Sequence, residues 1–177
     1  MKESGNLNLL APRKWFVFYT KSRQEKKVKE ILDRRGFDVF LPLQKVIRQW
    51  SDRKKKVEVP LFNSYLFVAV PEHKIEEVLQ VPGVAWLIRH NGRPAELHPA
   101  EYATILRFLE TGLLLETGPA EEFELGERVV VLDGPLKGQE GFLYGRNKGK
   151  FTVVLAGLGQ SIKLEINGLI IGKSKSA

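Results

Sequence analysis

The residues in this sequence best able to do chemistry are its basic and aromatic side chains. The chain has no cysteine, which excludes a disulfide scaffold, a cysteine nucleophile and a cysteine-ligated zinc site. Its three histidines, His73, His90 and His98, do not have the spacing of metal ligands. The sequence contains neither a Gly-x-Ser-x-Gly nucleophile motif nor the Gly-x-x-x-x-Gly-Lys-Ser/Thr phosphate loop. We therefore expect a protein that is not an enzyme and that has no cofactor and no metal site.

The positive charge of the chain is concentrated in one segment. Between Arg23 and Lys56 there are 12 Lys and Arg and 5 Asp and Glu, so the segment carries 12 − 5 = +7, equal to the net charge of the whole chain. From Thr111 to the end the two kinds of charge balance, with 8 of each. A one-sided basic patch is typical of a protein that binds a polyanion, and a solvated surface is the alternative interpretation.

An aromatic stretch follows this basic segment directly. Pro60–Val68 contains Phe62, Tyr65 and Phe67 within a few residues. Such residues suit an ordinary half-buried strand, but exposed aromatic rings beside basic residues also suit a binding surface. Periodicity alone does not decide between the two interpretations.

The elements around these residues predict an α+β first domain over residues 13–110. Strands are expected at 14–19, 37–50, 55–60, 65–70 and 84–88, and the 48–56 segment forms the end of a basic hairpin. Ser22 and Glu25 have the spacing of a capping box for a helix over 23–35. Further helices are expected after Pro71 and Pro99. Helices on one face of a largely antiparallel sheet give a sandwich of ferredoxin-like type.

The C-terminal part predicts a second, smaller domain. Residues 1–12 are expected to be a disordered tail, and 111–122, which contain Gly112, Gly118 and Pro119, a linker. From 123 to 173, five short strands alternate with glycine-rich turns. This pattern is typical of a small β-barrel that serves as a binding module.

Several stretches together resemble NusG-type transcription factors. Trp15–Tyr19 with the basic helix, Pro60–Val68 and Val81–Val84 are similar to the N-terminal (NGN) domain of that family. Gly126–Val129 and Asp133–Gly138, followed by Glu140-Gly141, resemble its KOW motif, so the second domain is expected to be a five-stranded SH3-like barrel. Where the family usually has proline between the Phe and Tyr of the aromatic motif, this chain has Asn63-Ser64, so the geometry of that turn is not implied.

The resemblance implies functional residues by position. A hydrophobic depression that docks on the clamp helices of the largest RNA polymerase subunit would be lined by Trp15, Phe16, Tyr19, Phe62, Tyr65, Phe67 and Leu87. The side toward the gate loop of the second-largest subunit would carry Lys74, Ile75, Glu76 and Glu77. Lys21, Arg23, Gln24 and Lys27 would approach the non-template DNA strand. Arg53, Lys54 and Lys55 are expected to contact DNA for a different reason, because they belong to the basic hairpin, whose charges could meet phosphates. The KOW motif would comprise Gly126, Val129, Asp133, Gly134, Pro135, Gly138 and Gly141.

The function implied is transcription elongation or antitermination. Bridging the polymerase cleft would favour the closed, elongating state, and the barrel would recruit the ribosomal protein NusE or the termination factor Rho. The chain looks like a specialised paralogue of the RfaH or UpxY kind, working as a monomer. With no signal peptide and no apolar run long enough to span a membrane, we expect it in the cytoplasm. The alternative is a ribosome-associated RNA-binding protein that uses the KOW barrel and the basic patch.

Overall fold

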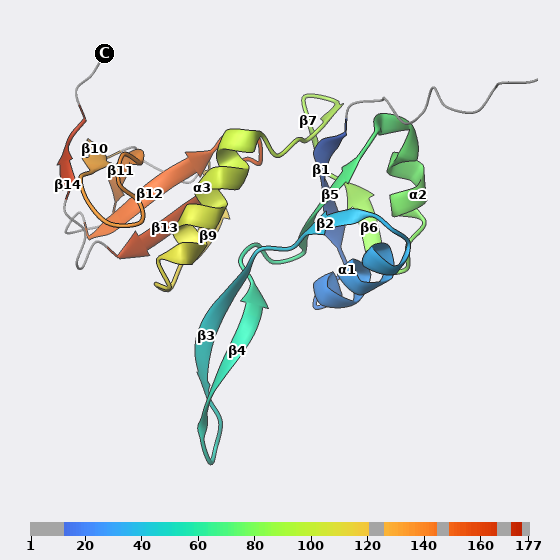
Figure 1. Cartoon of the computed structure of the whole chain (residues 1–177), viewed down its shortest axis with the longest axis horizontal. Coiled ribbons are helices and arrows are strands. Elements are labelled where there is room, and N and C mark those ends of the chain that lie inside the picture. Colours follow the sequence, from blue (N-terminus) through green and yellow to red (C-terminus); the bar gives the residue numbers. More distant parts are fainter. Residues whose placement is uncertain (1–12, 121–125, 145–148, 166–170, 175–177) are drawn as a thin grey trace, which may run out of the picture. The chain divides into compact units, whose positions relative to one another are not determined.

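The computed structural model describes residues 13–120, 126–144, 149–165 and 171–174 (Figure 1). They group into two compact units: the chain up to Leu41 with Asn63–Leu97, and Pro42–Phe62 with the chain from His98 onward. Some predictions lie outside the described residues: the tail at 1–12, the junction of linker and barrel at 121–125, the turn at 146–148 and the start of the last strand at 169–170. No helix in the described ranges is long and apolar enough to cross a membrane.

The first unit is built on an antiparallel sheet of four strands in the order β2-β5-β1-β6. Its helices are α1 and α2, and a short 3₁₀ turn, η2, precedes α2. A small hairpin of two-residue strands, β7 and β8, follows β6. The elements are β1 (Lys14–Thr20), α1 (Glu25–Arg34), β2 (Asp38–Phe40), β5 (Tyr65–Val70), η2 (Glu72–Lys74), α2 (Ile75–Leu79), β6 (Val84–Leu87), β7 (Arg89–His90) and β8 (Arg93–Pro94).

One face of this sheet forms the core of the first unit. Phe16 and Phe18 of β1 lie opposite Val68 and Leu66 of β5, and all four side chains are fully buried. Val28 and Leu32 of α1 are also fully buried. Each such side chain contributes about 1.5–3 kcal/mol by leaving water. The predicted α+β architecture of this part of the chain is confirmed.

The predicted capping box at the start of α1 is wrong. The helix begins at Glu25, its N-cap residue is Gln24, and no side chain caps it. The Glu25 carboxylate accepts a hydrogen bond of 2.8 Å from the backbone N–H of Ser64 instead. A buried backbone donor needs an acceptor, so the Asn63-Ser64 turn takes the carboxylate that the sequence pattern assigns to Ser22.

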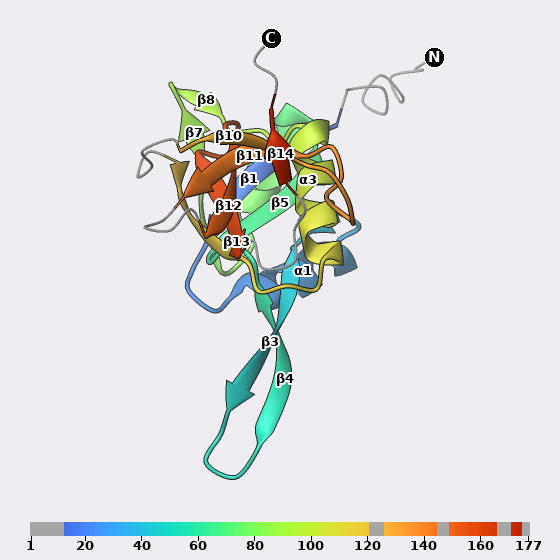
Figure 2. The same ribbon diagram turned by 90° about the vertical axis from the view of Figure 1, so that its left-hand side faces the viewer.

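A two-stranded ribbon formed by β3 (Leu43–Gln49) and β4 (Lys54–Pro60) belongs to the second unit. The two strands pair only with each other, and the ribbon is twisted (Figure 2). Near its base, the side-chain amide of Gln44 donates to the carbonyl of Leu115 at 3.0 Å and accepts from the N–H of Leu115 at 3.1 Å. The predicted basic hairpin is therefore present, and its base is tied to the segment before β9.

The rest of the second unit is a sheet in the order β14-β10-β11-β12-β13-β9, with one helix, α3. The five strands predicted for the barrel are β10 to β14, and β9 pairs with β13 as a sixth. The fold class predicted for this part is confirmed. The elements are α3 (Pro99–Glu110), β9 (Glu116–Pro119), β10 (Arg128–Val131), β11 (Glu140–Tyr144), β12 (Lys150–Leu155), β13 (Gln160–Glu165) and β14 (Ile171–Lys173).

Helix α3 packs on the barrel rather than only following the first domain in sequence. Phe108 stacks on Phe151 of β12, with ring centroids 6.1 Å apart and an interplanar angle of 12°. The Arg107 guanidinium donates to the carbonyls of Pro135 and Lys137 at 3.3 and 2.5 Å. The Glu101 carboxylate accepts from the N–H of Gly157 at 2.7 Å. Helix α3 and strand β9 thus pack with the barrel strands, whereas the sequence places α3 in the first domain and residues 111–122 in a linker. The functional division into domains stays a prediction.

We predict that Phe108→Ala destabilises the barrel by about 3–5 kcal/mol, because it removes a fully buried ring and leaves a cavity. The measurement is native-state hydrogen exchange of the β12 amides in the full-length protein. Leu106→Ala on the same helix is the control, since Leu106 is 37% exposed and should change stability by less than about 1 kcal/mol. Equal effects of the two substitutions would show that α3 does not support the barrel.

Candidate docking face and nucleic-acid interface

The second face of the four-stranded sheet is lined by aromatic side chains. Side chains alternate between the faces of a strand, and directly paired residues share a face. Tyr19 pairs with both Tyr65 and Trp86, and Val17 pairs with Phe67, which in turn pairs with Phe40. We call this surface the aromatic face; its aromatic residues are Trp15, Tyr19, Phe40, Tyr65, Phe67 and Trp86.

The rings of the aromatic face contact one another. The Trp86 ring stacks on Tyr19, with centroids 4.4 Å apart and planes within 6°, and Tyr65 meets Tyr19 edge-on at 5.9 Å. Phe40 contacts Trp15 at 6.2 Å and Phe67 at 5.7 Å. Aromatic pairs of this kind add about 0.5–1.5 kcal/mol each beyond the area they bury. The mutual contacts therefore hold the rings in defined orientations.

Trp86 is the most exposed member of this face. Its side chain is 55% exposed, whereas Tyr19 and Tyr65 are half-buried and Phe67 is fully buried. A large exposed aromatic ring that is already ordered by stacking loses little conformational freedom when a partner covers it. The aromatic face thus has the chemistry of a protein-docking surface.

The structure separates the residues that were expected to line one depression. Trp15, Tyr19, Tyr65 and Phe67 share the aromatic face. Phe16 and Leu87 point to the opposite face, because they alternate with residues of the aromatic face, and both are buried. Phe62 precedes β5, is 2% exposed and groups with the second unit.

Sequence reasoning missed Phe40 and Trp86. Phe40 lies in the short strand β2, and its position opposite Phe67 depends on the pairing of β2 with β5. Trp86 falls within an expected strand, but alternation from the buried Val84 would place it on the same, buried side. The irregular register between Tyr19 and Thr20 breaks that alternation in β6 and leaves Trp86 opposite Tyr19. Its stacking on Tyr19 requires knowing that β6 lies next to β1, which the local sequence does not specify.

The predicted DNA-contact residues of the first unit gather at the end of β1. The N–H of Lys21 donates to the carbonyl of Gly83, and the N–H of Thr20 to the carbonyl of Ser64, both at 2.8 Å. Arg23 has a positive φ of 61°, a conformation that is uncommon for a residue with a side chain. Lys21, Arg23 and Lys27 are exposed and Gln24 is half-buried. This arrangement leaves the charges of the three basic side chains available to phosphate groups.

The predicted gate-loop residues lie at η2 and the start of α2. Lys74, Glu76 and Glu77 are exposed, whereas Ile75 is 8% exposed and contributes to the core. Three of the four side chains are therefore available to a partner. Elsewhere in the unit, the Glu96 carboxylate accepts a hydrogen bond of 2.9 Å from the Lys14 ammonium and raises the pKa of that group.

The second unit carries the remaining predicted site residues, those of the basic hairpin and those of the KOW motif. Arg53, Lys54 and Lys55 are exposed at the end of the β3–β4 ribbon. In the KOW motif, Gly126 and Gly141 are required by close packing, since a Cβ at either position would lie 1.6 Å from the Leu143 carbonyl oxygen or 2.6 Å from that of Thr152. Val129 is buried, and Asp133, Gly134, Pro135 and Gly138 surround the turn after β10. The motif therefore shapes the barrel, and its exposed turn is the part that can meet a ligand.

Comparison with known proteins gives a consistent result. Residues 13–106 match the family model described as transcription termination factor NusG. The transcription termination/antitermination protein NusG of Rickettsia felis is 27% identical over 168 residues, covering 88% of this chain and 87% of its own length. The corresponding Bacillus subtilis protein is 29% identical over 171 residues, covering 86% of this chain and 95% of its own length.

A solved structure on domain interaction in Thermotoga maritima NusG shares the fold. It aligns with a TM-score of 0.53 and 20% identity, and covers 92% of this chain and 98% of that one. The α+β unit and the β-rich unit together share the fold of that structure over most of both chains. The family model matches more than half of the chain, and the chain therefore belongs to the NusG family, which is not an enzyme family.

We predict that Glu25→Ala lowers the free energy of unfolding of the first unit by about 1–3 kcal/mol, because the buried N–H of Ser64 loses its acceptor. Glu25→Gln, which keeps an acceptor oxygen, should lose less. Urea unfolding followed by tryptophan fluorescence measures the effect, with Trp50→Phe as the background so that the signal comes from Trp15 and Trp86 of the first unit. Glu30→Ala, an exposed position on the same helix, is the control, and a loss no greater than the control's would refute the role of this carboxylate.

Proposed function

We propose that this protein is a transcription elongation or antitermination factor that docks on RNA polymerase through the aromatic face. The occupant of the face would be the clamp helices of the largest subunit. The observation that carries the proposal is the exposed Trp86 ring, stacked on Tyr19 beside Tyr65. Aromatic side chains with preset orientations are the usual energetic centres of protein interfaces.

The other exposed groups would complete the contact with the transcription machinery. Lys74, Glu76 and Glu77 would face the gate loop of the second-largest subunit. Lys21, Arg23, Gln24 and Lys27 would approach the non-template DNA strand, with Arg53, Lys54 and Lys55 on a second DNA-contacting element. Binding both sides of the polymerase cleft favours the closed state only if the protein binds that state more tightly, so the effect on elongation is a population shift.

The KOW barrel would recruit a further factor, either the ribosomal protein NusE or Rho. The aromatic motif with Asn63-Ser64 supports a specialised, operon-restricted paralogue of the RfaH or UpxY kind, acting as a monomer in the cytoplasm. Binding of ribosomal RNA through the barrel alone would leave the aromatic face without a role, which favours the polymerase over the ribosome as the first partner.

The direct test is binding of the full-length protein to a fragment carrying the clamp helices. Trp86→Ala and Tyr65→Ala should each raise the Kd about 30-fold, since each removes a central interface ring worth about 2 kcal/mol. Ile47→Ala is the matched control, because Ile47 is a large apolar residue that is 65% exposed on the ribbon. Unchanged affinity of both aromatic variants would exclude the aromatic face as the docking surface.

A further inference from the structure

The β3–β4 ribbon has an unusual balance of charge for an exposed element. It carries Lys45, Arg48, Arg53, Lys54, Lys55 and Lys56 against Asp52 and Glu58, which gives 6 − 2 = +4 over residues 43–60. Among the described residues, the one ion pair recorded for these six basic groups joins Arg53 to Asp52 at 3.8 Å. The ribbon therefore keeps a net positive charge that an anionic partner could meet.

The pairing register places two like charges together in the half of the ribbon nearer its turn. Arg48 lies directly opposite Lys55 there, whereas nearer the base Lys45 lies opposite Glu58. Like charges in directly opposed positions destabilise an antiparallel pair. A bound polyanion would relieve this repulsion, so the register favours an anionic ligand over a merely solvated surface.

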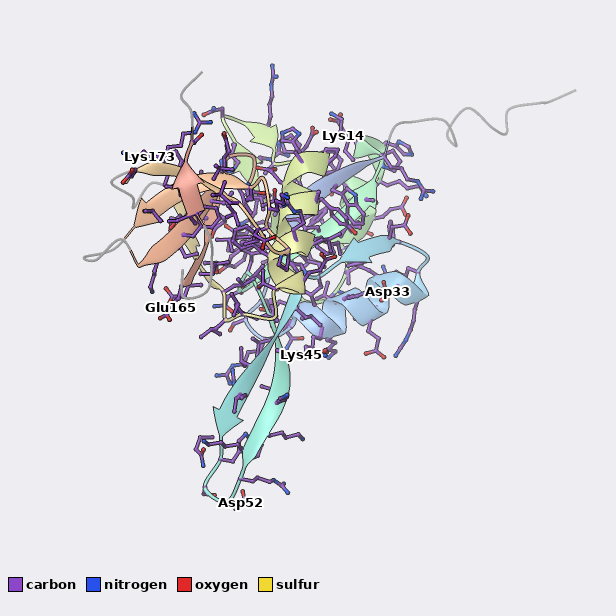
Figure 3. All side chains as sticks on the ribbon, turned by 60° about the vertical axis from the view of Figure 1, so that its left-hand side comes forward. Lys14, Asp33, Lys45, Asp52, Glu165 and Lys173 are labelled. Carbon is purple, nitrogen blue, oxygen red and sulfur yellow. The ribbon has the colours of Figure 1, made fainter. Side chains whose placement is uncertain are left out.

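The charge is also present on both faces of the ribbon. Arg48 and Lys55 are on one face, and Lys54 and Lys56, opposite Gln49 and Ile47, are on the other. Figure 3 shows side chains standing out on both sides, with Lys45 labelled on the ribbon and Asp52 at the turn. A single strand lying on the ribbon would meet one face only. A duplex groove has a row of phosphates on each wall, and a two-stranded ribbon is narrow enough to enter it.

An exposed tryptophan lies at the end of the ribbon. The N–H of Trp50 donates to the carbonyl of Arg53 at 2.8 Å, which closes the turn and fixes the backbone of Trp50. Its side chain is nevertheless 54% exposed, so it does not belong to a core. Apolar side chains in such positions can insert between base pairs and unstack them.

We propose that the β3–β4 ribbon is an arm that enters a groove of duplex DNA and inserts Trp50 between base pairs. The inference deepens the DNA-contacting role proposed for Arg53, Lys54 and Lys55 and rests on it. Strands of seven residues extend about 23 Å, which spans about two-thirds of a helical turn of DNA. Arg48 and Lys55 would meet one phosphate row and Lys54 and Lys56 the other.

The test uses the full-length protein without polymerase. The probes are a DNA duplex of about two helical turns carrying 2-aminopurine, its single strands, and an RNA duplex of the same sequence. We expect the DNA duplex to bind at least about tenfold more tightly than either other probe, with a rise in 2-aminopurine fluorescence as bases unstack. Lys55→Gln and Lys56→Gln should each reduce the slope of log K against log salt by about 1.

Trp50→Ala should abolish the fluorescence rise and weaken duplex binding about tenfold, whereas Ile47→Ala, another exposed apolar residue of the ribbon, should do neither. Equal affinity for single strands or RNA, or a full fluorescence rise with Trp50→Ala, would overturn the proposal. Tyr65→Ala and Trp86→Ala should leave duplex binding unchanged. Unchanged clamp-helix affinity of those two variants would therefore count against polymerase docking and not against the arm. Absence of duplex binding by the parent protein would count against the arm and not against polymerase docking.

Discussion

The pairing of β1 with β5 is the constraint on which the rest of the first unit depends. Six residue pairs in one antiparallel register, from Lys14 opposite Val70 to Tyr19 opposite Tyr65, decide the face that each aromatic ring takes. A shift of β1 by one residue would move Phe16 and Phe18 out of the core and turn Val17 and Tyr19 toward it in their place. Because the core rings and the rings of the aromatic face come from the same strands, a single register determines both the core and the surface proposed for docking. The Glu25 carboxylate supports this register at the turn that leads into β5.

The second unit combines a buried apolar core with short, specific contacts. Helix α3 adds the Phe108–Phe151 stack and two sets of hydrogen bonds to barrel loops. The two reciprocal hydrogen bonds between the side-chain amide of Gln44 and the backbone of Leu115 hold the base of the ribbon in the same way. The far end of the ribbon is left with exposed charge and the Trp50 ring. A ribbon that binds a polyanion needs a base that is held in place and a tip with exposed basic and aromatic side chains, and the β3–β4 ribbon has both.

Much of this architecture follows from the sequence alone. Alternation and glycine spacing predict the strands of both units, and the aromatic and KOW motifs point to the family. Three features depend on tertiary pairing and could not be read locally. Glu25 has a capping-box position but bonds Ser64, because a buried N–H elsewhere competes for its carboxylate. Phe16 and Leu87 are large apolar residues of the kind expected on a docking surface, but they alternate with the residues of the aromatic face and so point to the opposite side of the sheet. Trp86 joins the aromatic face only because β6 lies beside β1.

The central claim is that the aromatic face, and not the helical side of the sheet, meets RNA polymerase. Site-specific photo-crosslinking in a transcribing complex tests this most directly, with the crosslinking residue placed at position 86 and, as a control, at position 30 on the exposed side of α1. The account predicts a crosslink from position 86 to the largest polymerase subunit and none to that subunit from position 30. A crosslink to that subunit from position 30 alone would contradict it.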